Sequence, residues 1–155
     1  MALWGNTDAD EAKPKWMTSA EKADVYATDR GWVKLNGKGL EEVICSIGGL
    51  STSVGGADIN TSAFVGAAFD VSAGGNVDVR LTFNEKVTVT GSPTITITNS
   101  QAGGGSAATK TATYQSGSGT NKLVFRCTIG AAGSTVSADD VLSIASQNIA
   151  LAGGT

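Results

Sequence analysis

The stretch VDVRLTF, residues 77–83, determines the fold class of the chain. Its apolar side chains, at Val77, Val79, Leu81 and Phe83, stand at every second position with polar side chains between them. Neighbouring side chains of a β-strand point to opposite faces, so this period of two places all four apolar groups on one face. We therefore predict a strand here, with that face buried.

The same alternation recurs along the rest of the C-terminal part. It is found in KVTVT at 86–90, TITIT at 94–98, KLVFRCTI at 122–129 and DVLSIAS at 140–146. Segments rich in glycine and serine separate these runs, among them AGGGS at 102–106 and SGSGTN at 116–121. Short strands between such turns are typical of a β-sandwich or barrel, so the sequence predicts an all-β fold.

The first 60 residues have a different composition. All three tryptophans of the chain lie there, together with nine of its fourteen acidic residues. Charged residues become sparse beyond a flexible, glycine-containing stretch at 48–61. We predict an N-terminal arm over residues 1–60 and a β domain over residues 61–155.

The arm carries signals for two small elements. Thr18 and Glu21 have the spacing of a capping box, which predicts a short helix within residues 18–27. Two apolar runs on either side of Asn36-Gly37 predict a β-hairpin. Two-stranded units are marginal in water, so we expect the indoles of the arm to be buried either by the β domain or by a neighbouring molecule.

We interpret the tryptophans of the arm as anchors for a partner protein. The predicted partner-binding residues are Trp4, Trp16, Trp32, Pro14 and Tyr26. Tryptophan gives a large contact area at little entropic cost and is over-represented among interface hot spots. Pro14 favours extended backbone around it, which would suit addition of a strand to a neighbour. The alternative is that the indoles only cover the base of the β domain.

The composition argues against catalysis and against cofactors. The chain has no histidine, the side chain that most often serves as a general base or metal ligand near neutral pH. Glu85, Asp139 and Asp140 form the one candidate carboxylate group of the β domain, and loop carboxylates seldom form the buried cleft that catalysis needs. The acidic segment 8–11 is interpreted as solvated or partner-facing rather than as a metal site. We predict no enzymatic activity, no cofactor and no metal.

Charge and cysteine content narrow the partners further. A net charge of −3 without a basic run argues against nucleic acid or a membrane as partner. The opening residues lack the apolar segment of a secretory signal, so we expect synthesis in a cytoplasm. Cys45 and Cys127 match neither a disulfide framework nor a zinc site, and Cys127 is predicted to be a small buried hydrophobe. Their spacing leaves a bond between them open.

The β domain resembles the bacterial immunoglobulin-like repeats of large surface adhesins. The matching segments are GNVDVRLTFNEKVTVTGSPTITI at 75–97, TATYQSGSGTNKLVFRCTI at 111–129 and LSIASQNIALAGGT at 142–155. The resemblance implies an immunoglobulin-like antiparallel β-sandwich. Gly75-Asn76 stands where the family has Gly-Asp, and Asp139 and Asp140 are what remains of the family's acidic run. These departures remove part of the calcium-binding pattern of multi-repeat adhesins.

The arm resembles the opening of small virion structural proteins of marine tailed phages. The resemblance rests on MALWG at 1–5 and DADEAKPKW at 8–16, and continues through DRGWV at 29–33 and EEVICSIGGL at 41–50. Together the two resemblances imply a capsid decoration or cement protein that binds the major capsid protein or other virion proteins. Such a protein would be located in the virion and present as a homo-oligomer or in many copies.

Two other functions remain open. A tail or head-fibre adhesion module would bind the host surface through the sandwich loops. The aromatic residues of the β domain lie mostly at strand positions, which disfavours glycan binding. A fragment of a bacterial surface protein is the third alternative, and the missing export signal disfavours it.

Overall fold

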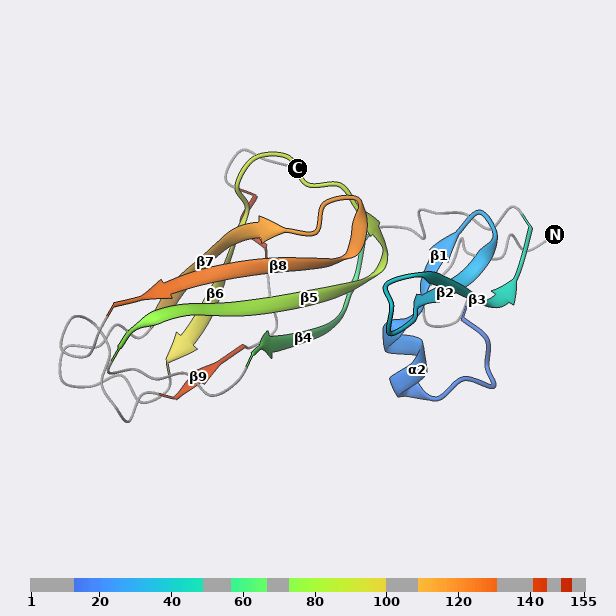
Figure 1. Cartoon of the computed structure of the whole chain (residues 1–155), viewed down its shortest axis with the longest axis horizontal. Coiled ribbons are helices and arrows are strands. Elements are labelled where there is room, and N and C mark those ends of the chain that lie inside the picture. Colours follow the sequence, from blue (N-terminus) through green and yellow to red (C-terminus); the bar gives the residue numbers. More distant parts are fainter. Residues whose placement is uncertain are drawn as a thin grey trace. The chain divides into compact units, whose positions relative to one another are not determined.

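The computed structural model describes residues 13–48, 57–66, 73–99, 109–130, 141–144 and 149–151. Strands dominate these residues and form two antiparallel sheets (Figure 1). One sheet has three strands in the order β1-β2-β3, and the other has six in the order β4-β5-β8-β7-β6-β9. The six-stranded sheet is curled as a half-barrel. The predicted all-β class is confirmed.

The elements are short apart from two strands of the larger sheet. Helix α2 is Ser19–Asp24. The strands are β1 Tyr26–Thr28, β2 Gly31–Leu35, β3 Glu41–Ser46, β4 Ile59–Val65, β5 Gly75–Val87, β6 Thr94–Asn99, β7 Thr109–Ser116, β8 Thr120–Ile129 and β9 Leu142–Ser143.

The chain divides into two compact units. Unit 1 comprises residues 1–61, 81–88 and 117–122, and unit 2 comprises residues 62–80, 89–116 and 123–155. Unit 1 thus contains the predicted arm together with two short segments of the predicted β domain. Strands β4, β5 and β8 have residues in both units.

Both elements predicted in the arm are present. Thr18 caps α2: its hydroxyl accepts a hydrogen bond from Glu21 N at 3.3 Å, and its own N–H donates to Glu21 Oε2 at 2.8 Å. This is the predicted capping box. The hairpin of β2 and β3 turns at Asn36, whose Oδ1 accepts from the N–H groups of Lys38 and Leu40, each at 3.0 Å.

The core of unit 1 is built around one indole. Trp32 on β2 is fully buried and packs with the buried residues Met17, Val25 and Ala27. Ile44, Cys45 and Ile47 pack against this cluster from the other strand of the hairpin and from just beyond it. The expectation that the arm could not shield its indoles does not hold for Trp32, because the turn before α2, the start of β1 and the hairpin together enclose it.

Unit 2 follows the period-two pattern. In β8 the side chains of Leu123, Phe125, Cys127 and Ile129 are buried at alternate positions, as predicted. Ile95 and Ile97 of β6 are buried in the same way. The two cysteines are free, and burial raises the pKa of the Cys127 thiol.

Two strand predictions need correction, and two strands were missed. KVTVT does not form a strand of its own: Val87 ends β5, and residues 88–90 lie outside any strand. The chain continues extended from VDVRLTF through Val87 as one strand. Strands β4 and β7 were not predicted, because their polar and small residues show no clear apolar alternation. In DVLSIAS only Leu142–Ser143 is a strand among the described residues.

Candidate partner-binding surface

The predicted anchors occupy different environments. Trp16 is 68% exposed, whereas Trp32 is 0% exposed, and Trp4 lies outside the described residues. Trp16 stands in the turn that precedes α2. In this conformation Trp16 is therefore the described indole that offers its ring to a partner, and Trp32 is a core residue.

Pro14 and Tyr26 also lie inside unit 1. The Pro14 carbonyl accepts a hydrogen bond from Met17 N at 3.2 Å, so the backbone turns here instead of extending as predicted. Pro14 is buried and Tyr26 is 2% exposed. Neither ring reaches the surface, so the expected strand addition at Pro14 and direct contact through Tyr26 do not fit this conformation.

A hollow of about 500 Å³ adjoins Trp16. Residues of the turn, of α2 and of the hairpin strands β2 and β3 line it: Trp16, Met17, Ala20, Glu21, Asp24, Val25, Lys34, Val43 and Ile44. Val43, on the outer strand of the three-stranded sheet, is 41% exposed. We call Trp16 and this hollow together the Trp16 groove.

The groove stays open because α2 cannot close it. The helix sequence SAEKAD contains no large apolar side chain, and none of its residues is buried. A helix normally covers a core with an apolar stripe, and this one has none to cover the indole that precedes it. The lack of an apolar stripe in the helix is a feature of the sequence that indicates an exposed Trp16. No feature of the sequence indicates that Val43 is exposed.

The lining of the groove includes charges of both signs, carried by Glu21, Asp24 and Lys34. Hydrogen bonds from the backbone and hydroxyl of Thr18 lower the pKa of Glu21, which keeps this carboxylate charged in mildly acidic solution. Asp24 Oδ1 pairs with Lys122 Nζ at 3.3 Å. Protein interfaces likewise combine apolar contacts with polar and charged groups.

A buried lysine holds the turn before α2 in place. Lys13 is 1% exposed, and its Nζ donates a hydrogen bond to the carbonyl of Lys22 at 2.7 Å. The same ammonium lies 5.8 Å from the centre of the Trp32 ring. A cation near the C-terminal end of a helix and over an indole is favourably placed on both counts. Lys13 thereby ties the buried indole to the segment that presents Trp16.

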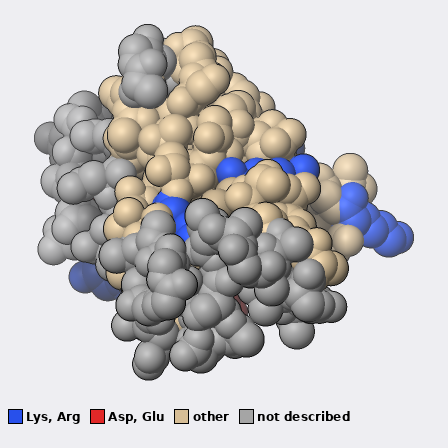
Figure 2. Space-filling view, turned by 90° about the vertical axis from the view of Figure 1, so that its left-hand side faces the viewer, with Lys and Arg blue, Asp and Glu red and all other residues tan. Residues whose placement is uncertain are grey.

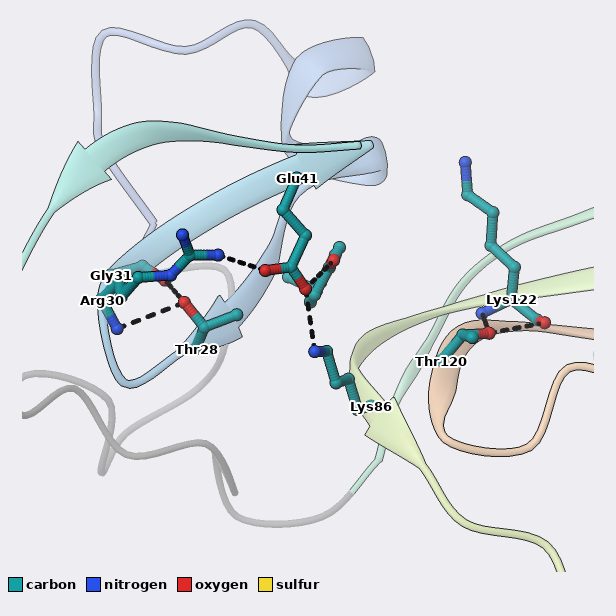
Figure 3. Close-up of polar contacts among 8 residues, drawn as sticks. Thr28, Arg30, Gly31, Glu41, Lys86, Thr120 and Lys122 are labelled. Carbon is teal, nitrogen blue, oxygen red and sulfur yellow. Dashed lines mark hydrogen bonds and ion pairs between the residues drawn. The ribbon is translucent and has the colours of Figure 1, made fainter. Parts of the chain in front are cut away.

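Unit 1 also contains a polar cluster centred on Glu41. Figure 3 shows its carboxylate between the side chains of Arg30 and Lys86. Glu41 Oε1 lies 2.8 Å from Lys86 Nζ and accepts a hydrogen bond from Tyr26 Oη at 2.8 Å. The hydrogen bond from Lys86 contributes most to lowering the pKa of Glu41, and the hydrogen bond from Tyr26 lowers it further. Burial, followed by the hydrogen bond to Glu41, raises the pKa of Tyr26. The cluster fixes Tyr26 and explains its burial.

Features of an active or metal site were also sought among the described residues. These residues contain no group of three His, Cys, Asp or Glu side chains that could hold a metal ion. Glu85 is buried. The other predicted acidic groups, Asp139, Asp140 and the segment 8–11, lie outside the residues that the structure describes. On the face shown in Figure 2, the Lys and Arg side chains of the described residues lie in small separate groups.

Comparisons with known proteins give no assignment. No family model, curated protein or solved structure matches the chain. None of the helices in the described part is long and apolar enough to cross a membrane.

Proposed function

We propose that this chain is a virion structural protein, a decoration or cement subunit that binds the major capsid lattice of a phage through the Trp16 groove. The observation that carries the proposal is the exposed indole of Trp16, 68% accessible beside a hollow on the arm that Val43 and Ile44 help to line. The resemblance of the arm to phage virion proteins supports the choice of partner. In this proposal Trp32 and Tyr26 support the arm from inside.

Physical chemistry favours a binding role for this indole. A tryptophan left in water gives up the stabilisation of about 1.5–3 kcal/mol or more that burial of a large apolar side chain brings. A partner side chain seated in the groove would bury Trp16 and Val43 together. The charged side chains of the lining would then orient the partner.

The proposal extends to the β domain. We propose that the curled six-stranded sheet is a variant of the immunoglobulin-like sandwich, as the resemblance to adhesin repeats implies. Its support is the set of antiparallel strands with an alternating buried row in β8. In the virion this domain would occupy the surface outside the lattice contact.

Binding to virus particles that lack the chain tests the function. We expect the purified protein to bind such particles and Trp16→Ala to weaken binding roughly thirtyfold or more, the loss of a hot-spot residue of at least about 2 kcal/mol. Leu40→Ala is the matched control, because Leu40 is 63% exposed on the same hairpin and does not line the groove.

The outcomes separate the alternatives. Equal binding by the Trp16→Ala and wild-type proteins would overturn the role of the groove. Failure of the wild type to bind particles, with binding to host cells instead, would replace the decoration protein with an adhesion module.

A further inference from the structure

Among the strands that the structure describes, β4 is an edge strand, and it contributes little to the core. It stands first in the six-stranded order and pairs with β5 on one side. Every residue from Thr61 to Val65 is exposed, so both faces of the strand are accessible. Phe64 and Val65 are each 41% exposed. A β-strand with two uncovered faces leaves its apolar side chains in water.

Two common protections against pairing with another chain are absent from the strand. Edge strands are commonly blunted by charged side chains, by proline or by a bulge that turns the edge away. The sequence of β4, INTSAFV, contains no charged residue and no proline. The opposite edge, β9, has only two residues and presents little backbone.

The backbone hydrogen bonds indicate which groups point outward. Asp58, just before β4, accepts a hydrogen bond from Asn84 N on β5 at 3.1 Å. Alternate residues of an antiparallel strand direct their N–H and C=O groups to opposite edges. In a regular strand Asn60, Ser62 and Phe64 then follow Asp58 toward β5. The outward-pointing groups belong to Ile59, Thr61, Ala63 and Val65.

We propose that β4 pairs with β4 of a second copy of this chain, antiparallel, about a two-fold axis at Ser62. A seven-residue strand that pairs with itself in this register places Ser62 opposite Ser62, Thr61 opposite Ala63 and Ile59 opposite Val65. The nearest flanking charge, Asp58, falls opposite Gly66, so like charges do not meet. Because the strand is uncharged and its flanking charge does not meet its own copy, a second copy of the chain is the partner that we propose.

The size of the contact sets its strength. Two paired edges of this length bury less than the roughly 1,200 Å² of total area that marks stable interfaces. We therefore expect a dimer that forms at high concentration, suited to copies held close together on a surface. This inference rests on β4 alone and does not depend on the Trp16 groove.

Cysteine cross-linking tests the register. In a background with Cys45→Ser and Cys127→Ala, Ser62→Cys should form a disulfide-linked dimer under mild oxidation, because residue 62 occupies a close, non-hydrogen-bonded pair. Thr61→Cys alone should link poorly, since residues 61 of the two copies would be about 7–8 Å apart on the diagonal. A mixture of the Thr61→Cys and Ala63→Cys proteins should form disulfide-linked dimers efficiently, because the proposed register places these two positions opposite each other. Linking of Ser62→Cys no faster than of Ser92→Cys, an exposed loop control, would overturn the proposal.

Sedimentation of the full chain gives a second test without new thiols. The wild type should shift from monomer to dimer as concentration rises. Ser62→Lys should remain monomeric, because it places two ammonium groups opposite each other, with circular dichroism showing that it folds. A wild type that stays monomeric at millimolar concentration, or a Ser62→Lys dimer as strong as the wild type, would contradict β4 pairing.

Discussion

Unit 1 and unit 2 bury their apolar residues by different routes. In unit 2 the row of Leu123, Phe125, Cys127 and Ile129 follows from simple alternation along one strand. In unit 1 the indole of Trp32 is enclosed by short elements, packs with Met17, Val25 and Ala27, and lies near a buried lysine. We expect a regular buried row to tolerate the loss of one member better than a cluster centred on one large ring.

The largest expected effect removes that ring. Trp32→Ala should lower the free energy of unfolding of unit 1 by about 3–5 kcal/mol, the cost of deleting a buried aromatic side chain. Trp16→Ala, at an exposed position, should change it by less than about 0.5 kcal/mol. Urea denaturation followed by circular dichroism measures both. Similar losses of unfolding free energy in the two variants would contradict the assignment of Trp32 to the core and of Trp16 to the surface.

A smaller effect is expected at the start of β2. Gly31 has a φ of 120°, and a Cβ added there would lie 2.1 Å from the carbonyl oxygen of Cys45. Gly31→Ala should therefore destabilise unit 1 by about 1–3 kcal/mol, because the backbone has to shift. Gly37→Ala is the control, since nothing lies within 4 Å of its added Cβ. The same urea titration should show the control unchanged or slightly stabilised.

In unit 2 the ion pair between neighbouring strands β5 and β8 should contribute less. Arg126 donates from Nε to Asp78 Oδ1 at 2.7 Å and from Nη2 to Oδ2 at 2.8 Å. Both side chains are partly exposed, so we expect a coupling energy of up to about 1 kcal/mol. A double-mutant cycle with Arg126→Met and Asp78→Asn measures it. A coupling of zero would show that alternation alone stabilises this unit.

The smallest effect concerns the pH dependence of unit 1. Hydrogen bonds from Lys86 and Tyr26 hold the pKa of Glu41 below its usual range. A carboxyl with a lowered folded-state pKa stabilises the fold above its unfolded pKa of about 4.3, and this contribution is lost as the pH falls through the folded value. The stability difference between wild type and Glu41→Gln should thus be constant near neutral pH and shrink below about pH 4. Glu42→Gln, an exposed neighbour, is the control. A stability difference that does not vary with pH would show that the ionisation of Glu41 does not stabilise unit 1.

Sequence reasoning recovered the parts of the fold where local pattern and burial agree. Alternation identified β8, and cap and turn chemistry identified α2 and the hairpin. It missed β4, whose strand conformation depends on pairing with β5 rather than on an apolar face of its own. It divided β5 in two because the pattern changes at Asn84-Glu85, although the chain continues extended.

The candidate site was predictable in part. Aromatic composition pointed to the arm, but could not separate Trp16 from Trp32, because enclosure of Trp32 depends on Val25, Met17 and the hairpin meeting in space. The exposure of Val43 depends on the same packing. The short helix without an apolar face was the one local signal that Trp16 would stay uncovered.

The contrast between an exposed and an enclosed indole gives the molecule an optical reporter of its own. Trp16, in contact with water, should emit at longer wavelength and be quenched by acrylamide, while Trp32, 0% exposed, should emit at shorter wavelength and resist quenching. With Trp4 replaced by phenylalanine, docking at the groove would be visible as a blue shift without any attached dye.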